Sequence, residues 1–264
     1  MNHFQDAKRV VFKVGTSTLT HDTGKLNLRR MRDLSRVLSD LKNAGREVVL
    51  VSSGAIAVGV HKLNLEKRPH DIGGRQACAA VGQCELMYIY DKLFSEYGHV
   101  TAQVLLTRDC VDDRIRNMNI QNAFERLMGM GALPIVNEND TVAVEEIVFG
   151  DNDTLSAIVA KVVNADALII LTDIDGLHEQ NPRTNPDAKL IHVVEKVTQH
   201  TRDIAGGTGS SRGTGGMITK IEAADIATNA GIVTAIIDGS DPDDIYRLFD
   251  GEPIGTVFLA RRGN

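Results

Sequence analysis

The chain has 264 residues, of which 42% are hydrophobic and 24% are charged, and its formal net charge at pH 7 is -6. This composition predicts a globular protein with a sizeable core, and the acidic balance argues against a nucleic-acid-binding surface, which needs basic residues to neutralise phosphates. No apolar run reaches the ~18 residues of a membrane span, and the first residues lack the layout of a signal peptide. The three cysteines lack metal-ligand spacing, which suits a reduced compartment. We therefore expect a cytoplasmic protein that does not contact a membrane.

The first predicted unit is a strand, a loop and a helix. Residues 9–14, Arg-Val-Val-Phe-Lys-Val, are typical of a buried strand, and a Gly-Thr-Ser loop follows them. Asn27 is a typical N-cap for the next helix, in which leucines and a methionine recur at spacings of three and four until Gly45. We therefore expect Lys13 close to the carboxyl end of the first strand.

A second apolar run, residues 48–51, ends in the small residues Ser52, Ser53 and Gly54. Their backbone N–H groups could receive an anion at the start of a helix, but a tight turn without a ligand explains them equally well. A helix, a strand and a helix are predicted next, over residues 75–98, 101–106 and 117–128. We expect the methionine and isoleucine side chains there to belong to the core or to a subunit contact.

Two polar clusters lie between residues 131 and 157. The apolar residues 133–136 predict a buried strand, and four polar residues follow it: Asn137, Glu138, Asn139 and Asp140. The second cluster precedes an apolar-periodic helix: Gly150, Asp151, Asn152 and Asp153. Because ligands bind at the carboxyl ends of strands in open α/β sheets, the clusters predict a binding site. A polar loop and an ordinary helix cap are the alternative, although two such clusters exceed what capping requires.

The last third of the chain continues the alternation of strands and helices. An apolar run over residues 167–171 ends in Thr172 and Asp173, and the Asp-x-Asp-Gly fragment that follows is too short for a calcium loop. A strand, a short helix and a strand are predicted at the end, over residues 232–237, 241–249 and 256–260. The alternation predicts an α/β fold, a three-layer αβα sandwich with a mostly parallel central sheet.

A glycine-rich segment, residues 206–216, leads directly into a helix over residues 217–230 that carries Lys220 one turn inside. A cationic phosphate-binding loop is one interpretation, and a disordered linker is the other. The segment is not a P-loop, because Lys220 is followed by Ile221. Its glycine spacing also differs from that of a dinucleotide-binding turn.

Cations, glycine-rich backbone and acids therefore converge on the predicted strand ends. The charged residues concerned are Lys13, Lys220, Asp140, Asp153 and Asp173. Lysines and main-chain N–H groups suit phosphoryl transfer, in which catalysis is mainly positioning and neutralisation of a spread negative charge. The residues predict a kinase.

Six strings carry a resemblance that covers essentially the whole chain. They are FKVGTS at 12–17, VSSGAIAVG at 51–59, VNENDTVAVEEI at 136–147, FGDNDTLSA at 149–157, LTDIDGL at 171–177 and GTGGMITK at 213–220. With these motifs the chain resembles the amino acid kinase family, and within it the members that phosphorylate glutamate.

The resemblance implies ATP-dependent phosphorylation of the γ-carboxylate of L-glutamate, the first step of proline biosynthesis, with Mg²⁺ as a cofactor. It implies an eight-stranded, largely parallel sheet between helices, with glutamate in the N-terminal half, about residues 1–165, and nucleotide in the C-terminal half, about residues 166–264. A homo-oligomer and feedback inhibition by proline are further implications. Many family members continue into a PUA-type domain, and we expect these 264 residues to form a single kinase domain without one.

Carried over position by position, the resemblance implies that Lys13 and Lys220 contact the transferring phosphoryl group and that Asp153 holds both lysines in place. It implies that three residues bind glutamate: Ser53, Asp140 and Asn152. Asp140, an acid, suits the α-ammonium group of the substrate. The nucleotide is expected to contact Lys13, Thr172, Asp173, Thr214, Gly215, Gly216, Met217, Ile218, Thr219 and Lys220. No metal ligands are assigned.

Other members of the superfamily share the nucleotide half, namely the N-acetylglutamate, carbamate, aspartate and UMP kinases. The choice of substrate therefore depends on residues 137–153 and on Ser53. A non-catalytic sensor of nucleotide or amino acid on the same fold is an alternative of a different class. The presence of Lys13, Asp153 and Lys220 argues against it.

Overall fold

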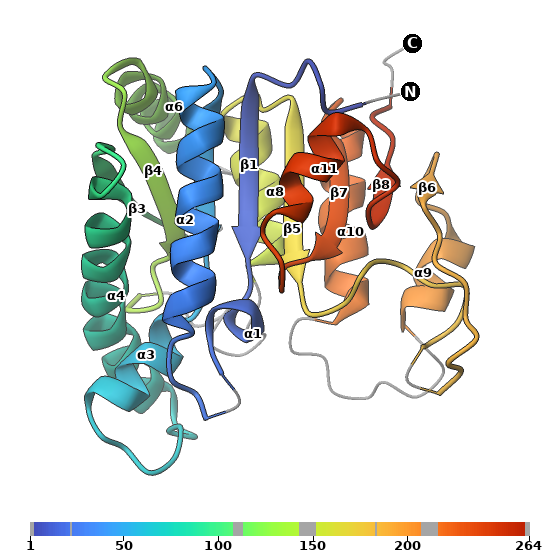
Figure 1. Ribbon diagram of the computed structural model, residues 1–264. Helices are drawn as coiled ribbons and strands as arrows, with labels where there is room; N and C mark the ends of the chain where they lie inside the picture. The colour runs from blue at the N-terminus through green and yellow to red at the C-terminus, as the bar shows by residue number, and fades with distance from the viewer. Residues whose placement is uncertain are drawn as a thin grey trace.

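The computed structural model describes residues 3–21, 23–107, 113–142, 152–182, 184–206 and 216–261. At its centre lies an eight-stranded sheet with the order β3-β4-β2-β1-β5-β7-β8-β6 (Figure 1). The strands are β1 (Arg9–Val14), β2 (Glu47–Ser52), β3 (Thr101–Leu106), β4 (Leu133–Glu138), β5 (Ala167–Thr172), β6 (Val193–Val194), β7 (Val233–Asp238) and β8 (Thr256–Phe258). All neighbouring strands pair in parallel except β7 and β8, which confirms the mostly parallel sheet.

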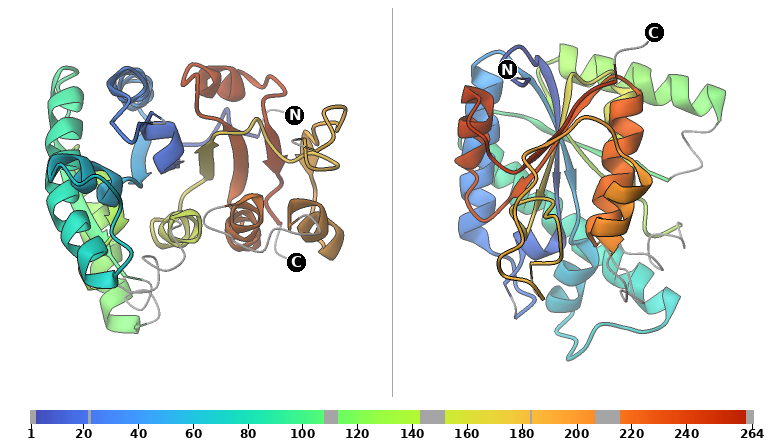
Figure 2. Two further views of the ribbon diagram at one scale, coloured as in Figure 1. Left: turned by 90° about the horizontal axis from the view of Figure 1, so that it is seen from below. Right: turned by 90° about the vertical axis from the view of Figure 1, so that its right-hand side faces the viewer.

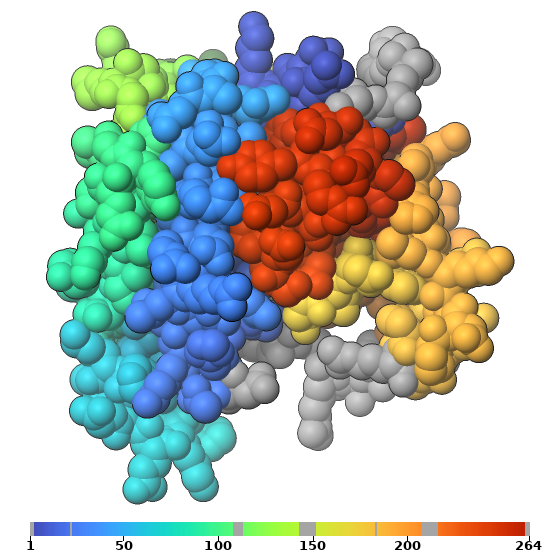
Figure 3. Space-filling view, viewed as in Figure 1, coloured from blue at the N-terminus to red at the C-terminus, as the bar shows by residue number. Residues whose placement is uncertain are grey.

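Helices cover both faces of this sheet, as expected for a three-layer sandwich (Figure 2). The described helices are α1 (Thr16–Leu19), α2 (Leu28–Asn43), α3 (Ala55–Lys62), α4 (Ile72–Ser95), α6 (Arg114–Gly129), α8 (Asp153–Val162), α9 (Gln199–Gly206), α10 (Met217–Asn229) and α11 (Asp244–Asp250). Apolar side chains of α2, α4 and α11 form the core on one face, where these helices lie next to one another (Figure 3). Those of α6, α8 and α10 form the core on the other face.

The alternation of side chains along β1 directs Lys13 toward the second of these faces. Val10, Phe12 and Val14 pack into the core below α2, whereas Val11 packs into the core shared with α8 and α10. Lys13 is separated from Val11 by one residue, so its side chain leaves the strand on the same side as Val11. Strand β1 therefore places the buried side chain of Lys13 on the side of the sheet that α8 and α10 cover.

Several boundaries differ from the predicted ones, and local capping explains two of them. Helix α4 begins at Ile72 rather than at residue 75 because the Asp71 side chain accepts a hydrogen bond from the Gly74 N–H at 2.7 Å. Helix α6 likewise begins at Arg114 because Asp113 caps it. Helices α1 and α9 and strand β6 had no counterpart among the predicted elements. No helix in the described ranges is both long enough and apolar enough to cross a bilayer.

Candidate active site

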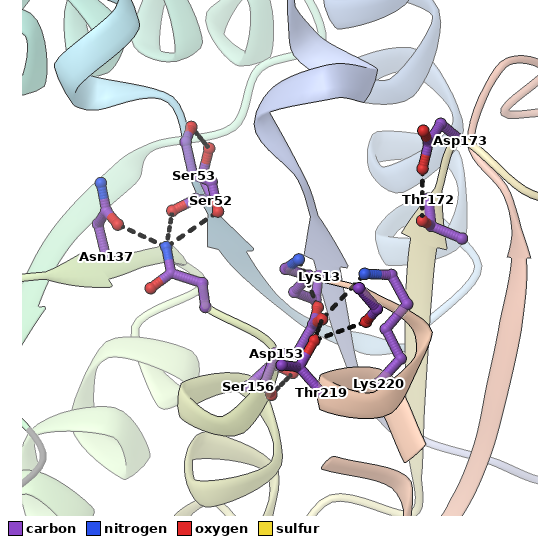
Figure 4. A network of polar contacts seen from close by, with 12 residues as sticks. Lys13, Ser52, Ser53, Asn137, Asp153, Ser156, Thr172, Asp173, Thr219 and Lys220 are labelled. Atoms are coloured by element: carbon purple, nitrogen blue, oxygen red, sulfur yellow. Dashed lines mark hydrogen bonds and ion pairs between the residues drawn. The ribbon is translucent and has the colours of Figure 1, made fainter. Parts of the chain in front are cut away.

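The carboxyl ends of β4, β2, β1 and β5 lie side by side along one edge of the sheet, because these four strands are neighbours and run in parallel. Polar side chains gather there (Figure 4). Since β1 lies between β2 and β5, Lys13 pairs with Val51 of β2 and with Ile170 of β5, one and two residues before the polar ends Ser52 and Thr172. The described members of the predicted clusters thus belong to a single edge, as expected for ligand binding in an open α/β sheet, whereas Gly150 and Asp151 lie outside the described residues.

Asp153 is the centre of this edge. Its Oδ1 forms an ion pair with Lys13, and its Oδ2 lies 3.0 Å from Lys220 Nζ and 2.9 Å from Thr219 Oγ1. Asp153 and both lysines are buried. Asp153 is also the first residue of α8, where the helix dipole favours a negative charge.

The two lysines determine the ionisation of Asp153. Burial alone would raise the pKa of Asp153, but the positive charges of Lys13 and Lys220 and their hydrogen bonds outweigh burial and hold the pKa well below its usual range. Two ammonium groups therefore contact one carboxylate in a buried place. Such an arrangement suits an anionic ligand.

Lys220 reaches Asp153 from helix α10, whereas Lys13 reaches it from strand β1. Helix α10 begins at Met217, so Lys220 lies one turn inside it, as the sequence predicts. Thr219 Oγ1 lies 2.7 Å from the carbonyl oxygen of Gly216, the N-cap residue, and also contacts Asp153. The start of α10 is thereby tied to the start of α8. Of the expected nucleotide contacts, Thr214 and Gly215 lie outside the described residues.

An amide network lies on the β2 and β4 side of the two lysines. Asn152, the N-cap residue of α8, uses its Nδ2 to contact the Ser52 carbonyl oxygen at 2.9 Å, Ser53 Oγ at 3.1 Å and Asn137 Oδ1 at 2.8 Å. Asn137 Nδ2 in turn donates to Gln83 Oε1 at 2.8 Å. The structure thus joins two of the three expected glutamate-binding residues, Ser53 and Asn152, directly to each other.

Two residues of α4 take part in this arrangement although sequence reasoning did not single them out. Gln83 contacts Asn137, and Tyr90 OH lies 2.9 Å from Ser52 Oγ. They are separated by about two helical turns, so they lie on the same face of α4. That spacing is common in any amphipathic helix, and it does not distinguish these residues from ordinary core positions.

Asp140 lies two residues beyond β4, at the same edge. Its side chain is buried, and it receives no hydrogen bond from the residues that the structure describes. Burial raises the pKa of Asp140 to about 6, although the positive charge of Arg68, on the segment between α3 and α4, partly offsets the rise. A buried carboxylate with a raised pKa is ready to pair with a cationic group of a ligand.

Thr172 and Asp173 lie on the other side of the lysines, at the end of β5 (Figure 4). Thr172 Oγ1 donates to Asp173 Oδ1 at 3.1 Å. The site thus has three parts along the sheet edge: an acid–amide side, a central pair of lysines and the end of β5. The described residues contain no group of three His, Cys, Asp or Glu side chains that could hold a metal ion.

The chain is similar to known kinases over most of its length. Residues 8–238 match the model of the amino acid kinase family. A glutamate 5-kinase of Clostridium perfringens (strain 13 / Type A) is 54% identical over 263 residues, which are 98% of this chain and 98% of that protein. A glutamate 5-kinase of Listeria monocytogenes (strain EGD-e) is 52% identical over 98% of this chain and 95% of its own.

A solved structure extends the likeness to the fold. The crystal structure of an isopentenyl phosphate kinase from T. acidophilum, in a product complex, superposes with a TM-score of 0.64 at 19% sequence identity. The alignment covers 95% of this chain and 99% of the other. At this identity the likeness concerns the architecture, which agrees with the predicted three-layer sandwich.

Proposed function

The chain belongs to the amino acid kinase family, and we propose that it transfers the γ-phosphoryl group of ATP to the γ-carboxylate of L-glutamate, giving L-glutamyl 5-phosphate and ADP, the first step of proline biosynthesis. Relatives named glutamate 5-kinase, 52% and 54% identical over nearly the whole chain, support the choice of substrate. The observation that carries the chemistry is the pair Lys13 and Lys220, both held on the carboxylate of Asp153.

The proposed reaction has an electrostatic difficulty that this pair addresses. The γ-carboxylate of glutamate, with a reference pKa of about 4.3, is already ionised at pH 7, so its attack on phosphorus needs no general base. A carboxylate oxygen forms a bond to the γ-phosphorus, and the bond to the bridging oxygen breaks, so that ADP leaves with the electron pair. Two anions must meet, and Lys13 and Lys220 neutralise the charge that spreads over the transferring phosphoryl group.

Asp153 is proposed to act by positioning. It touches both lysines and holds their ammonium groups at defined places before the substrates bind. Because the environment is buried, these groups need little reorganisation when charge develops in the transition state. Asp153 also limits the repulsion between the two cations while the site is empty of ligand.

The substrates are proposed to occupy opposite sides of the lysines. Glutamate would bind on the side of Ser53, Asp140 and Asn152, with its α-ammonium group near the Asp140 carboxylate. ATP would bind near Thr172, Asp173 and the start of α10, where Gly216, Met217, Ile218 and Thr219 lie. This division corresponds to an amino-acid half, about residues 1–165, and a nucleotide half, about residues 166–264.

Mg²⁺ is proposed to enter with the phosphates of ATP. The carboxylate at the centre of the site, that of Asp153, is already paired with two lysines, and the described residues offer no further cluster of metal ligands. Mg²⁺ often binds through substrate phosphates and water with few protein ligands, so these residues are compatible with it. We assign no protein ligand to the ion. Inhibition by proline, a homo-oligomer and a cytoplasmic location stay predictions.

ATP turnover with a panel of acceptors tests the proposal. Purified protein is incubated with Mg²⁺, ATP and either glutamate, N-acetylglutamate, aspartate, carbamate or UMP, and ADP release is followed by a coupled assay. We expect turnover with glutamate to exceed that with every other acceptor, and hydroxylamine to trap the product as a hydroxamate, because an acyl phosphate reacts with it. Turnover with another acceptor alone would assign a different family activity, and binding without any turnover would indicate a sensor.

A further inference from the structure

A chain of side-chain amides runs from helix α4 to the amino-acid side of the site, and Figure 4 shows its middle member, Asn137. Gln83 Oε1 accepts a hydrogen bond from Asn137 Nδ2, and Asn137 Oδ1 accepts one from Asn152 Nδ2, each at 2.8 Å. The chain ends at Asn152 Oδ1. This oxygen is buried and has no hydrogen-bond partner in the part of the protein that the structure describes.

Main-chain groups determine which way each amide faces. The Ser52 carbonyl can only accept, so the atom of Asn152 that lies 2.9 Å from it must be Nδ2. The Glu138 N–H can only donate, so the atom of Asn137 that lies 2.9 Å from it must be Oδ1. Asn137 Nδ2 therefore faces Gln83, and Asn152 presents Oδ1 as an acceptor without a donor.

A buried acceptor without a donor raises the free energy of the ligand-free protein, and it favours ligands that supply a donor. An unpaired buried polar group loses its hydration without compensation, and a ligand that supplies the missing donor removes the penalty. A ligand that lacks the donor leaves the penalty in place, which is how buried polar groups reject analogues. Glutamate carries an α-ammonium donor, whereas glutarate has the same two carboxylates and no amino group.

We propose that Gln83 is a positioning residue, which acts through Asn137 to hold Asn152 so that its Oδ1 meets the α-ammonium group of the substrate. The inference rests on the proposed function, which supplies the amino-acid substrate, and adds the part of the chain that selects a free amino group. Gln83 itself is half-buried on α4 and does not touch the reacting groups. Its contribution is the acceptor that keeps the Asn137 amide in place.

Helix α4 can hold Gln83 rigidly because its backbone is in contact with helix α3, which follows the turn after β2. A methyl group built on Gly82 would lie 1.8 Å from the Ala55 carbonyl oxygen and 2.5 Å from the Gly59 nitrogen, so α3 and α4 touch through their backbones. Ala55 is the first residue of α3 and follows the Ser53–Gly54 turn. The position of Gln83 is thereby coupled to that of Ser53.

The test compares glutamate with glutarate in wild-type protein and in Gln83→Leu. The leucine side chain removes the acceptor for Asn137 Nδ2 at similar volume. We expect KM for glutamate to rise about 10-fold, because a buried donor loses its partner and the Asn152 amide loses its fixed orientation. KM for glutarate, KM for ATP and kcat should change less than about 3-fold, so the preference for glutamate should fall about 10-fold.

Two matched variants separate positioning from general stability. Gln83→Glu keeps an oxygen acceptor at the same place and should restore the preference for glutamate. Tyr90→Phe removes a hydrogen bond from the same face of α4 to Ser52 but leaves the amide chain intact, so the preference should stay at its wild-type value even if the melting temperature falls. If Gln83→Leu does not fold, Gln83→Ala, which only shortens a half-buried side chain, takes its place.

The outcomes distinguish this inference from the proposed function. Calorimetric binding of glutamate and glutarate to wild-type protein is measured beside turnover. A wild-type protein that neither binds nor phosphorylates glutamate overturns the proposed function. A wild-type protein that uses glutamate, together with a Gln83 variant whose preference is unchanged or which loses both acids equally, overturns the positioning role alone.

Discussion

Lys220 of α10 and Asp153 of α8 form a buried ion pair, with Nζ 3.0 Å from Oδ2, and the same carboxylate contacts Lys13 of β1. Three elements that are distant in the sequence therefore meet at one carboxylate. Removing one partner of a buried pair leaves an uncompensated charge, which makes each of the three residues sensitive to substitution. The substitutions below separate their effects on catalysis, substrate binding and stability.

Removal of either lysine charge should impair the chemical step more than binding. We expect Lys13→Ala and Lys220→Ala each to lower kcat by roughly 10²-fold or more, with a smaller change in KM for glutamate, because one preorganised cation contributes about 3–4 kcal/mol to transition-state stabilisation. Steady-state rates at saturating ATP, with the glutamate concentration varied, measure kcat and KM for glutamate. Lys161→Ala, on the exposed side of α8, is the matched control and should keep wild-type kcat. Near-normal kcat in both active-site variants would refute the assignment.

Asp153→Asn should lower both kcat and stability. Without the carboxylate the two lysines repel each other, and breaking a buried ion pair typically costs about 3–5 kcal/mol. The folded-state pKa of Asp153 is depressed, so its contribution to stability is present above its ordinary value of 3.8 and is lost as pH falls further. In urea unfolding, the free energy of unfolding of the wild-type protein should therefore exceed that of Asp153→Asn by a constant amount near neutral pH. This difference should become smaller below about pH 4. A difference that does not depend on pH would contradict the ionised state of Asp153.

Asp140→Asn should weaken the binding of glutamate and leave the binding of ATP unchanged. If the carboxylate pairs with the α-ammonium group, its loss removes a charge-assisted hydrogen bond of roughly 1.5–3 kcal/mol, or about 10- to 100-fold in KM for glutamate. KM for ATP should be unchanged, and kcat should fall less than in the lysine variants. Initial rates with each substrate varied in turn decide the point. A variant that mainly loses ATP affinity would show that Asp140 lies on the nucleotide side.

The raised pKa of Asp140 predicts opposite pH effects on activity and on stability. Binding of the α-ammonium group needs the ionised carboxylate, so kcat/KM for glutamate should fall as pH drops through about 6, and Asp140→Asn should lack this inflection.

The same raised pKa affects stability. Because the folded-state pKa of Asp140 lies above the ordinary 3.8, protonated Asp140 favours folding below about pH 4, and this contribution is lost as pH rises through about 6. Asp140→Asn should therefore stabilise the ligand-free protein at pH 7.5 by roughly 2–3 kcal/mol in urea unfolding. Unchanged or lower stability of Asp140→Asn would contradict the raised pKa of Asp140 in the folded protein.

Gly82→Ala should destabilise the fold, because the new methyl group would collide with the Ala55 carbonyl oxygen at 1.8 Å. A backbone atom cannot move aside as a side chain does, so we expect a loss of about 2–3 kcal/mol in the free energy of unfolding. Gly73→Ala, in the same helix, is the matched control. A methyl group there would meet Asp71 Oδ1 at an ordinary 3.6 Å, and the substitution should be neutral or stabilising by up to about 1 kcal/mol. Equal stability of the two variants would refute the close contact of α3 and α4.

The sequence by itself determined the elements whose signals are local. The apolar run over residues 9–14 became β1, and the N-cap predicted at Asn27 accepts a hydrogen bond from the Arg30 N–H at 3.1 Å. The position of Lys220 one turn inside α10 was also predictable, because the glycines before it and the periodicity after it mark a helix start. Such features depend on residues within a few positions of one another, and a single sequence contains that information.

Only the tertiary structure decided which of these residues meet. The sharing of Asp153 by Lys13 and Lys220 depends on the order of the strands and on the face that each side chain takes, and neither is a property of a short segment. The same holds for Gln83, whose helical spacing resembles that of any core residue until β4 brings Asn137 beside it. The raised pKa of Asp140 has a similar origin, because desolvation arises from the packing of the whole edge and not from neighbours in the sequence.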